Sequence, residues 1–222
     1  MIYFISDLHF FHSNIFKYEP IRKEKFENHQ AYIKKIVENW NSVVNKDDEV
    51  YIVGDLFVGF NQFKKDLKIE NESEKEIAKK ILSKLNGKKY LIKGNHDKKT
   101  NSWYEDTGIE EVLLSKPLTF NNKNYFLLHY PICDEYTSKS KDLDYLKIVK
   151  GELQNCGDFI IIHGHTHSNV WCQNCDLKHF NVSIEQIDFT PISIKDVENK
   201  LEKENKWKIK NTKKICIFQN KN

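Results

Sequence analysis

Five short apolar runs in this chain each lead into side chains that can bind a metal ion or transfer a proton. The runs are IYFIS, YIV, YLIK, YFLL and FIII. The polar sets that follow them are Asp7 and His9; Asp55; Asn95, His96 and Asp97; His129; and His163, His165 and His167. Because strand ends at one edge of a sheet meet in space, we expect these side chains to converge.

Two of the sets contain residues two positions apart, Asp7 with His9 and His165 with His167. In an extended segment such residues point to the same side, so each pair can present two ligands toward one point. Three sets follow a glycine, which lets a strand turn sharply without steric cost; these are Gly54, Gly94 and Gly164. Either pair alone is common in ordinary loops, but five such sets where histidine is otherwise scarce predict a metal site. Aspartate, histidine and asparagine donors suit manganese, iron or zinc.

The motifs DxH, GD, GNHD, a separate histidine and GHxH occur in that order. This series resembles the calcineurin-like metallophosphoesterase superfamily, and in particular its small stand-alone bacterial and phage members. The resemblance spans residues 7–167, and we expect the residues after 168 to add little beyond strand and helix.

The resemblance implies a centre of two divalent metal ions, with manganese expected and iron, zinc or nickel as alternatives. It assigns one ion to Asp7, His9, Asp55 and His167, and the other to Asp55, Asn95, His129 and His165, so that Asp55 bridges the two. It also implies hydrolysis by a metal-activated hydroxide, with His96 protonating the leaving group. Asp97 would orient His96 or neighbouring groups.

Five further residues adjoin the motifs. His12, Asn14 and Arg22 could reach a substrate, whereas Tyr130 and His163 could support the ligands from behind. For each of them a surface or packing role is equally open.

The implied activity is hydrolysis of a small phosphate ester, and we expect a phosphodiester or nucleotide, with a phosphomonoester as the alternative. The segment from Gly54 to Gly59 lacks the GDxxDRG pattern of protein Ser/Thr phosphatases, so that substrate class is not expected. A nuclease is a third hypothesis, because the basic C-terminal segment 206–222 has six lysines and no acidic residue. A solvated tail explains this charge more simply. A catalytically silent binding scaffold is the alternative of another class, and the presence of His96 argues against it.

Composition indicates a folded, reduced protein rather than a secreted or membrane protein. Of the 222 residues 39% are hydrophobic and 30% are charged, and the net charge is only +3. No apolar stretch approaches the ~20 residues needed to cross a bilayer, and no signal peptide is recognisable. The five cysteines are an odd number, and only Cys172 and Cys175 form a CxxC pair. We therefore expect a cytoplasmic location with no membrane partner, whereas the oligomeric state is left open.

The elements that must position the motifs can be placed from periodicity and turn residues. We expect strands at 2–6, 49–53, 89–93, 159–163, 178–184 and 214–218, a hairpin at 117–129 turning at 121–124, and helices at 28–44, 74–86 and 140–155, with one more begun by Ser193 and Asp196. The capping box from Ser73 to Glu76 should begin the second helix and Gly87 should end it. The expected fold is a single α+β domain over residues 1–222, and the resemblance implies a four-layer α/β/β/α sandwich.

Overall fold

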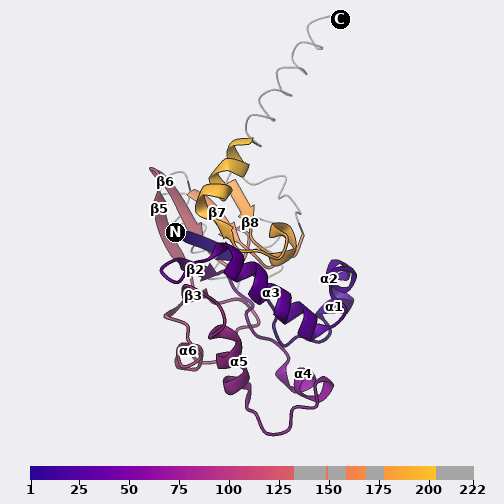
Figure 1. Cartoon of the computed structure of the whole chain (residues 1–222). Coiled ribbons are helices and arrows are strands. Elements are labelled where there is room, and N and C mark those ends of the chain that lie inside the picture. Colours follow the sequence, from indigo (N-terminus) through magenta and orange to yellow (C-terminus); the bar gives the residue numbers. More distant parts are fainter. Residues whose placement is uncertain (133–148, 150–158, 169–177, 204–222) are drawn as a thin grey trace, which may run out of the picture.

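Two mixed β-sheets form the centre of the protein (Figure 1). The computed structural model describes residues 1–132, 149, 159–168 and 178–203. The first sheet has the order β4-β3-β2-β1-β9, formed by Glu111–Leu113, Lys88–Ile92, Glu49–Ile52, Ile2–Ile5 and Ile192–Ser193. The second has the order β5-β6-β7-β8, formed by Lys116–Phe120, Lys123–Leu127, Phe159–His163 and Lys178–Asn181.

Strand direction places the predicted motifs at shared sheet edges. In the first sheet β1, β2, β3 and β4 are parallel and only β9 is antiparallel. In the second sheet β6, β7 and β8 are parallel and β5 pairs antiparallel with β6. A bridge between Ser6 and Ser183 joins the segment after β1 to the segment after β8. The carboxyl ends of β1, β2 and β3 therefore lie together, as do those of β6 and β7.

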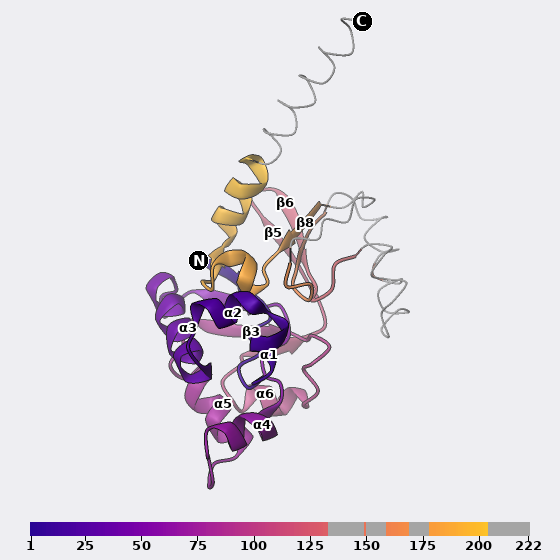
Figure 2. The ribbon, with the colours of Figure 1, turned by 90° about the vertical axis from the view of Figure 1, so that its right-hand side faces the viewer.

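Most of the described helices gather at one end of the molecule, away from β5 and β6 (Figure 2). They are α1 (Ile15–Tyr18), α2 (Pro20–Lys25), α3 (His29–Val43), α4 (Phe60–Asp66), α5 (Glu74–Leu82) and α6 (Asn101–Glu105). A 3₁₀ helix, η1 (Ile184–Ile187), follows β8, and residues 194–203 form a helix after β9. None of the helices in the described ranges is long and apolar enough to cross a membrane.

The spacing of apolar residues explains how the longer helices pack. Tyr32, Ile36 and Trp40 recur every four residues on α3, and all three are fully buried. The predicted capping box at Ser73 is present on α5. However, α5 ends at Leu82 and not near residue 86, because the chain tightens into turns at Lys84 and Leu85 that bond three residues back.

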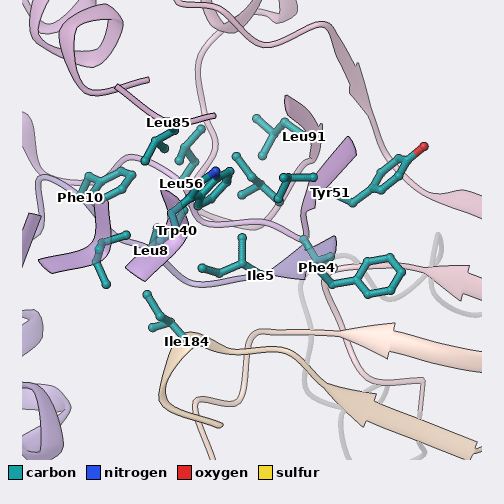
Figure 3. Packing of buried hydrophobic residues seen from close by; sticks show 14 of the residues in the cluster. Phe4, Ile5, Leu8, Phe10, Trp40, Tyr51, Leu56, Leu85, Leu91 and Ile184 are labelled. Carbon is teal, nitrogen blue, oxygen red and sulfur yellow. The ribbon is translucent and has the colours of Figure 1, made fainter. Parts of the chain in front are cut away.

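One main core lies between the helices and the two sheets, and Figure 3 shows part of it around Trp40, Ile5 and Leu56. The second sheet contributes alternate residues to this core, including Tyr125 on β6 and Ile162 on β7. Its opposite face belongs to a smaller cluster with Leu128, Tyr130, Ile132, Val149 and Ile161. Apolar side chains therefore pack on both faces of the second sheet, as in a sandwich.

The predicted α/β sandwich, two mixed sheets flanked by helices, is confirmed. The hairpin at 117–129 is present, and the helix begun by Ser193 is present. The short helices α1, α2, α4 and α6 and the strands β4 and β9 were not predicted, because two to seven residues carry too little periodicity. Apart from Val149, the predicted helix at 140–155 lies outside the described residues, as do the strand at 214–218 and the segment 206–222. The single domain over 1–222 stays a prediction.

Candidate metal centre

The loops that carry the predicted ligands adopt a left-handed backbone, not an extended one. Positive φ angles occur at Asp7 (59°), His9 (49°), Asp55 (57°), His165 (71°) and His167 (52°). The expectation that each pair acts through strand alternation is therefore wrong. The side chains converge because the chain bends sharply at each ligand. Such conformations are unfavourable for residues other than glycine by about 1 kcal/mol or more and tend to occur at functional sites.

Backbone hydrogen bonds hold the first two loops against each other in this geometry. The amide of Asp7 donates to the carbonyl of Gly54 at 3.0 Å, and the amide of His9 donates to the carbonyl of Asp55 at 2.9 Å. The amide of Phe10 donates to Leu56 at 3.0 Å. The loop after β1 and the loop after β2 thus form one rigid unit.

Four of the predicted ligands surround one point at the end of β1. His9 Nε2 lies 4.0 Å from Asp7 Oδ1 and 3.6 Å from Asp55 Oδ2. His167 Nε2 lies 3.7 Å from Asp7 Oδ1. Asp7, His9 and Asp55 are buried. Asp7, His9 and His167 offer ligand atoms close enough together to hold one metal ion.

The remaining predicted ligands lie beside this group. Asn95 Oδ1 is 3.1 Å from His129 Nε2 and 3.0 Å from His165 Nδ1. His129 Nε2 also lies 3.5 Å from Asp55 Oδ2. The other ring nitrogen of His129 donates to the carbonyl of Val53 at 2.9 Å, which fixes the ring so that Nε2 faces Asp55 and Asn95. Asp7, Asp55 and His129 form a second group that could hold an ion.

Buried nitrogen atoms without partners indicate that these donors fit a metal ion. Within the described ranges both ring nitrogens of His9 are buried and have no hydrogen-bond partner. Buried polar atoms are nearly always paired, so such an atom calls for an explanation. A cation among these carboxylate, amide and imidazole donors would supply the missing partner.

The protonation states of the unliganded site also suit metal binding. Burial would by itself raise the pKa of Asp7, but the charges of His129, His167 and His9 hold it below its ordinary value. Burial lowers the pKa of His9 well below its ordinary value and that of His165 to about 4. Metal binding needs an ionised carboxylate and neutral imidazoles, a state that the low pKa values of Asp7, His9 and His165 favour. At His167 burial lowers the pKa, but the hydrogen bond to Glu185 and the charge of Asp7 outweigh it and raise the pKa.

The glycines before the motifs matter mainly because of space. A Cβ on Gly164 would lie 1.9 Å from Ser6 Oγ and 2.5 Å from Asp7 Oδ2, and one on Gly94 would lie 2.2 Å from Asp55 Oδ1. Of Gly54, Gly94 and Gly164, only Gly54 has a positive φ, of 94°. The expected sharp turn is therefore present at Gly54, whereas the other two positions need glycine because ligand side chains approach the backbone closely.

His96 lies beside the predicted ligands, and its side chain is exposed to solvent. Its ring centroid is 5.5 Å from that of His9. Its backbone amide donates to Asp55 Oδ1 at 2.9 Å. The backbone of His96 is thus anchored beside the ligands, and its side chain is open to solvent.

Asp97 does not contact the ring of His96 within the described structure. Its carboxylate accepts from the backbone amides of Asp55 at 2.7 Å, Gly94 at 2.9 Å and Leu56 at 3.2 Å. The hydroxyl of Tyr104 also donates to it, at 3.2 Å. Burial raises the pKa of Asp97 to about 6. Of its two expected roles, orienting His96 or neighbouring groups, these contacts fit the second, because Asp97 holds the backbone of the loop that carries Asp55.

Arg22 cannot reach a substrate, contrary to one of its two expected roles, because it is fully buried. Its guanidinium donates to the carbonyls of Asp7 at 2.6 Å and Leu8 at 3.2 Å, and to Glu185 Oε1 at 2.6 Å. Glu185 was missed from sequence because it stands in none of the motifs. The expectation that the residues after 168 add little beyond strand and helix is therefore wrong, because Glu185 contacts Arg22 and His167.

The other candidate residues take different positions. The ring of His12 lies 5.5 Å from that of His9, and its Nδ1 is buried without a partner among the described residues. Tyr130 packs its ring 4.8 Å from that of His165. His163 contacts the carbonyl of Gly164 and the ring of His179. Asn14 precedes α1, and no described side-chain contact joins it to the ligands.

The chain is similar in sequence and in fold to several known proteins. An uncharacterized protein of Methanocaldococcus jannaschii is 32% identical over 206 residues, which are 91% of this chain and 92% of that protein. The gene 66 protein of Mycobacterium phage L5 is 28% identical over 182 residues, or 75% of this chain and 77% of its own. A crystal structure of a protein of unknown function from Aquifex aeolicus superposes with a TM-score of 0.69 at 27% identity, covering 90% of this chain and 98% of the other.

The matched regions cover most of each relative, and one relative is a phage protein, as expected for small stand-alone and phage members. The sequence profile of the calcineurin-like phosphoesterases matches residues 1–214, nearly the whole chain and all five motifs. The chain belongs to the calcineurin-like phosphoesterase family.

Proposed function

We propose that the protein is a metal-dependent hydrolase whose substrate is a small phosphodiester or nucleotide. The observation that carries the proposal is the convergence of Asp7, His9 and His167 around buried imidazole nitrogens that have no partner in the described structure. Two divalent ions bound here would activate water as the nucleophile and offset the charge of the phosphate.

Two overlapping sets of residues would hold these ions. Asp55 lies between them, because its Oδ2 is 3.6 Å from His9 Nε2 and 3.5 Å from His129 Nε2. This position supports Asp55 as the bridging ligand. The first set is Asp7, His9, Asp55 and His167, and the second is Asp55, Asn95, His129 and His165. Manganese suits these donors, as do iron, zinc and nickel.

His96 is proposed as the general acid. Its ring is exposed and lies next to His9, so it can approach an ester held at the metal centre from the solvent side. A histidine in this position protonates the departing oxygen, which removes the cost of expelling a charged leaving group. His12, whose ring centroid also lies 5.5 Å from that of His9, is proposed to bind the substrate through its ring.

The burial and contacts of Arg22 favour a phosphodiester substrate over a phosphomonoester. It is the only arginine in the chain, and it is buried and committed to Asp7, Leu8 and Glu185. A monoester carries up to one more negative charge than a diester, and bidentate arginine contacts are a common way of holding such a dianion. A site that has none of these contacts suits the less charged diester, so phosphomonoester hydrolysis is the second candidate.

The test is hydrolysis of an aryl phosphodiester and the matching monoester by metal-stripped protein with and without added manganese. The proposal expects faster turnover of the diester and a strict need for metal. Turnover of neither ester by metal-loaded protein would leave the binding scaffold as the better account.

A further inference from the structure

A buried ion pair connects the two chain segments that present Asp7 and His167. Arg22 is fully buried, and the side chain of Glu185 is 2% exposed. The guanidinium approaches Glu185 Oε1 through both Nε and Nη2 at 2.6 Å. The two residues are 163 positions apart in the chain, so this contact is a product of the tertiary fold.

The same carboxylate oxygen also determines which ring nitrogen of His167 carries the proton and how the ring is oriented. The Nδ1–H of His167 donates to Glu185 Oε1 at 3.1 Å, while Nε2 points toward Asp7 Oδ1 at 3.7 Å. A hydrogen bond at Nδ1 keeps the proton there and leaves the Nε2 lone pair available to an ion. Next to Glu185, Gln186 Nε2 donates to the carbonyl of His167 at 2.8 Å, so η1 holds this ligand at two points.

Arg22, the other member of the ion pair, holds the backbone of the second ligand, Asp7. It donates to the carbonyls of Asp7 and Leu8, at the left-handed turn that presents Asp7. The hydroxyl of Tyr32 donates to the same Leu8 carbonyl at 2.5 Å. One ion pair therefore restrains both a carboxylate ligand and an imidazole ligand of the same proposed ion.

We propose that Glu185, supported by Arg22, is a positioning residue that orients His167 for the ion held with Asp7 and His9. This inference rests on the proposed function, because that function places an ion there. Glu19, His167 and Glu185 also form a group of potential ligands. However, the guanidinium at 2.6 Å from Glu185 Oε1 opposes a further cation on that oxygen.

The experiment compares manganese titrations of metal-stripped wild type, Glu185→Gln and Glu19→Gln by calorimetry. Glu185→Gln keeps the shape of the side chain but removes its charge. The affinity of one of two ions should fall about 10- to 100-fold and the other should be unchanged, as for partners of ligating histidines elsewhere. Glu19→Gln is the matched control, because its carboxylate is 3.9 Å from His167 Nδ1, too far for a hydrogen bond.

A second measurement examines the contact without metal. Nitrogen-15 NMR of the metal-stripped protein should show the proton of His167 on Nδ1 in the wild type and a mixture of tautomers in Glu185→Gln. Thermal unfolding of both proteins without metal reports any general loss of structure.

The outcomes separate the two proposals. Two ions bound equally well by wild type and Glu185→Gln would refute the positioning role alone. Equal weakening of both ions together with a lower Tm would mean a purely structural ion pair. Three ions in the wild type and two in the variant would make Glu185 a ligand. A wild type that binds no metal would refute the proposed function, and the positioning role with it.

Discussion

Nε2 of His9 and Oδ2 of Asp55 face each other at 3.6 Å in a buried environment, too far apart for a hydrogen bond. Two donor atoms that each lie about 2.1 Å from one ion are separated by about 3 to 3.5 Å. The spacing of His9 and Asp55 is thus close to that of two ligands of a shared ion. A substitution that removes one of these ligands should therefore weaken the binding of that ion.

Asp55→Asn should reduce the metal content of the purified protein to less than one ion per chain. The amide keeps the size of the carboxylate but carries no charge, and Asp55 lies between His9 and His129. Elemental analysis checks this prediction, with Asp66→Asn at the exposed end of α4 as the control. Full metal retention by Asp55→Asn would exclude a bridging role.

His96→Ala should retain both ions and lose about 10²- to 10⁴-fold in kcat for the diester. The loss should be smaller for esters whose leaving group is a weakly basic phenolate, because such a group needs less help from an acid. Steady-state kinetics with a series of aryl diesters measures this. Lys98→Ala, an exposed neighbour, is the control. An equal loss for all leaving groups would argue against proton donation by His96.

Gly164→Ala should destabilise the protein by roughly 2 kcal/mol or more and impair metal binding. The added Cβ would overlap Ser6 Oγ and Asp7 Oδ2. Gly108→Ala is the matched control, because its φ is +108° but nothing lies near the position of its Cβ. That variant should show backbone strain of about 1 kcal/mol and normal metal content. Urea unfolding and elemental analysis distinguish the two, and similar results for both variants would contradict the crowding at Gly164.

The metal-stripped protein should lose stability as pH falls from 6.5 toward 4, in part through His29. Burial among aromatic rings lowers the pKa of His29 from 6.5 to about 4, although its Nε2 donates to the carbonyl of Phe10. The unfolded chain therefore binds more protons than the folded chain in this window. The free energy of unfolding consequently decreases as the pH decreases. The shift corresponds to about 3 kcal/mol. His29→Gln should flatten the dependence in urea unfolding series, and an unchanged slope would contradict it.

Much of the scaffold could be predicted from sequence because its signals are local. The spacing of Tyr32, Ile36 and Trp40 predicts α3 to within one residue at each end, and the Ser73 capping box predicts the start of α5. The motifs also predict which side chains come together. Asp7 and Asp55 come together because β1 and β2 are parallel neighbours in the first sheet, whereas His129 reaches them from the end of β6 in the second sheet.

What could not be predicted depends on contacts between distant segments. Arg22 and Glu185 stand in no motif, and only the folded chain places them together. Asp97 directly follows His96, yet its carboxylate turns inward to backbone amides, because a buried carboxylate must find donors. The left-handed conformation of His9 and His167 likewise depends on the surrounding structure and not on local preference.

The most direct test of the central claim is the rate of aryl phosphodiester hydrolysis as manganese is added back to metal-stripped protein. The proposed function predicts no turnover without metal and a rise that saturates near two ions per chain, in line with two overlapping groups of ligands. Turnover that is unaffected by metal removal, or no turnover of either ester in protein shown to hold two ions, would contradict it.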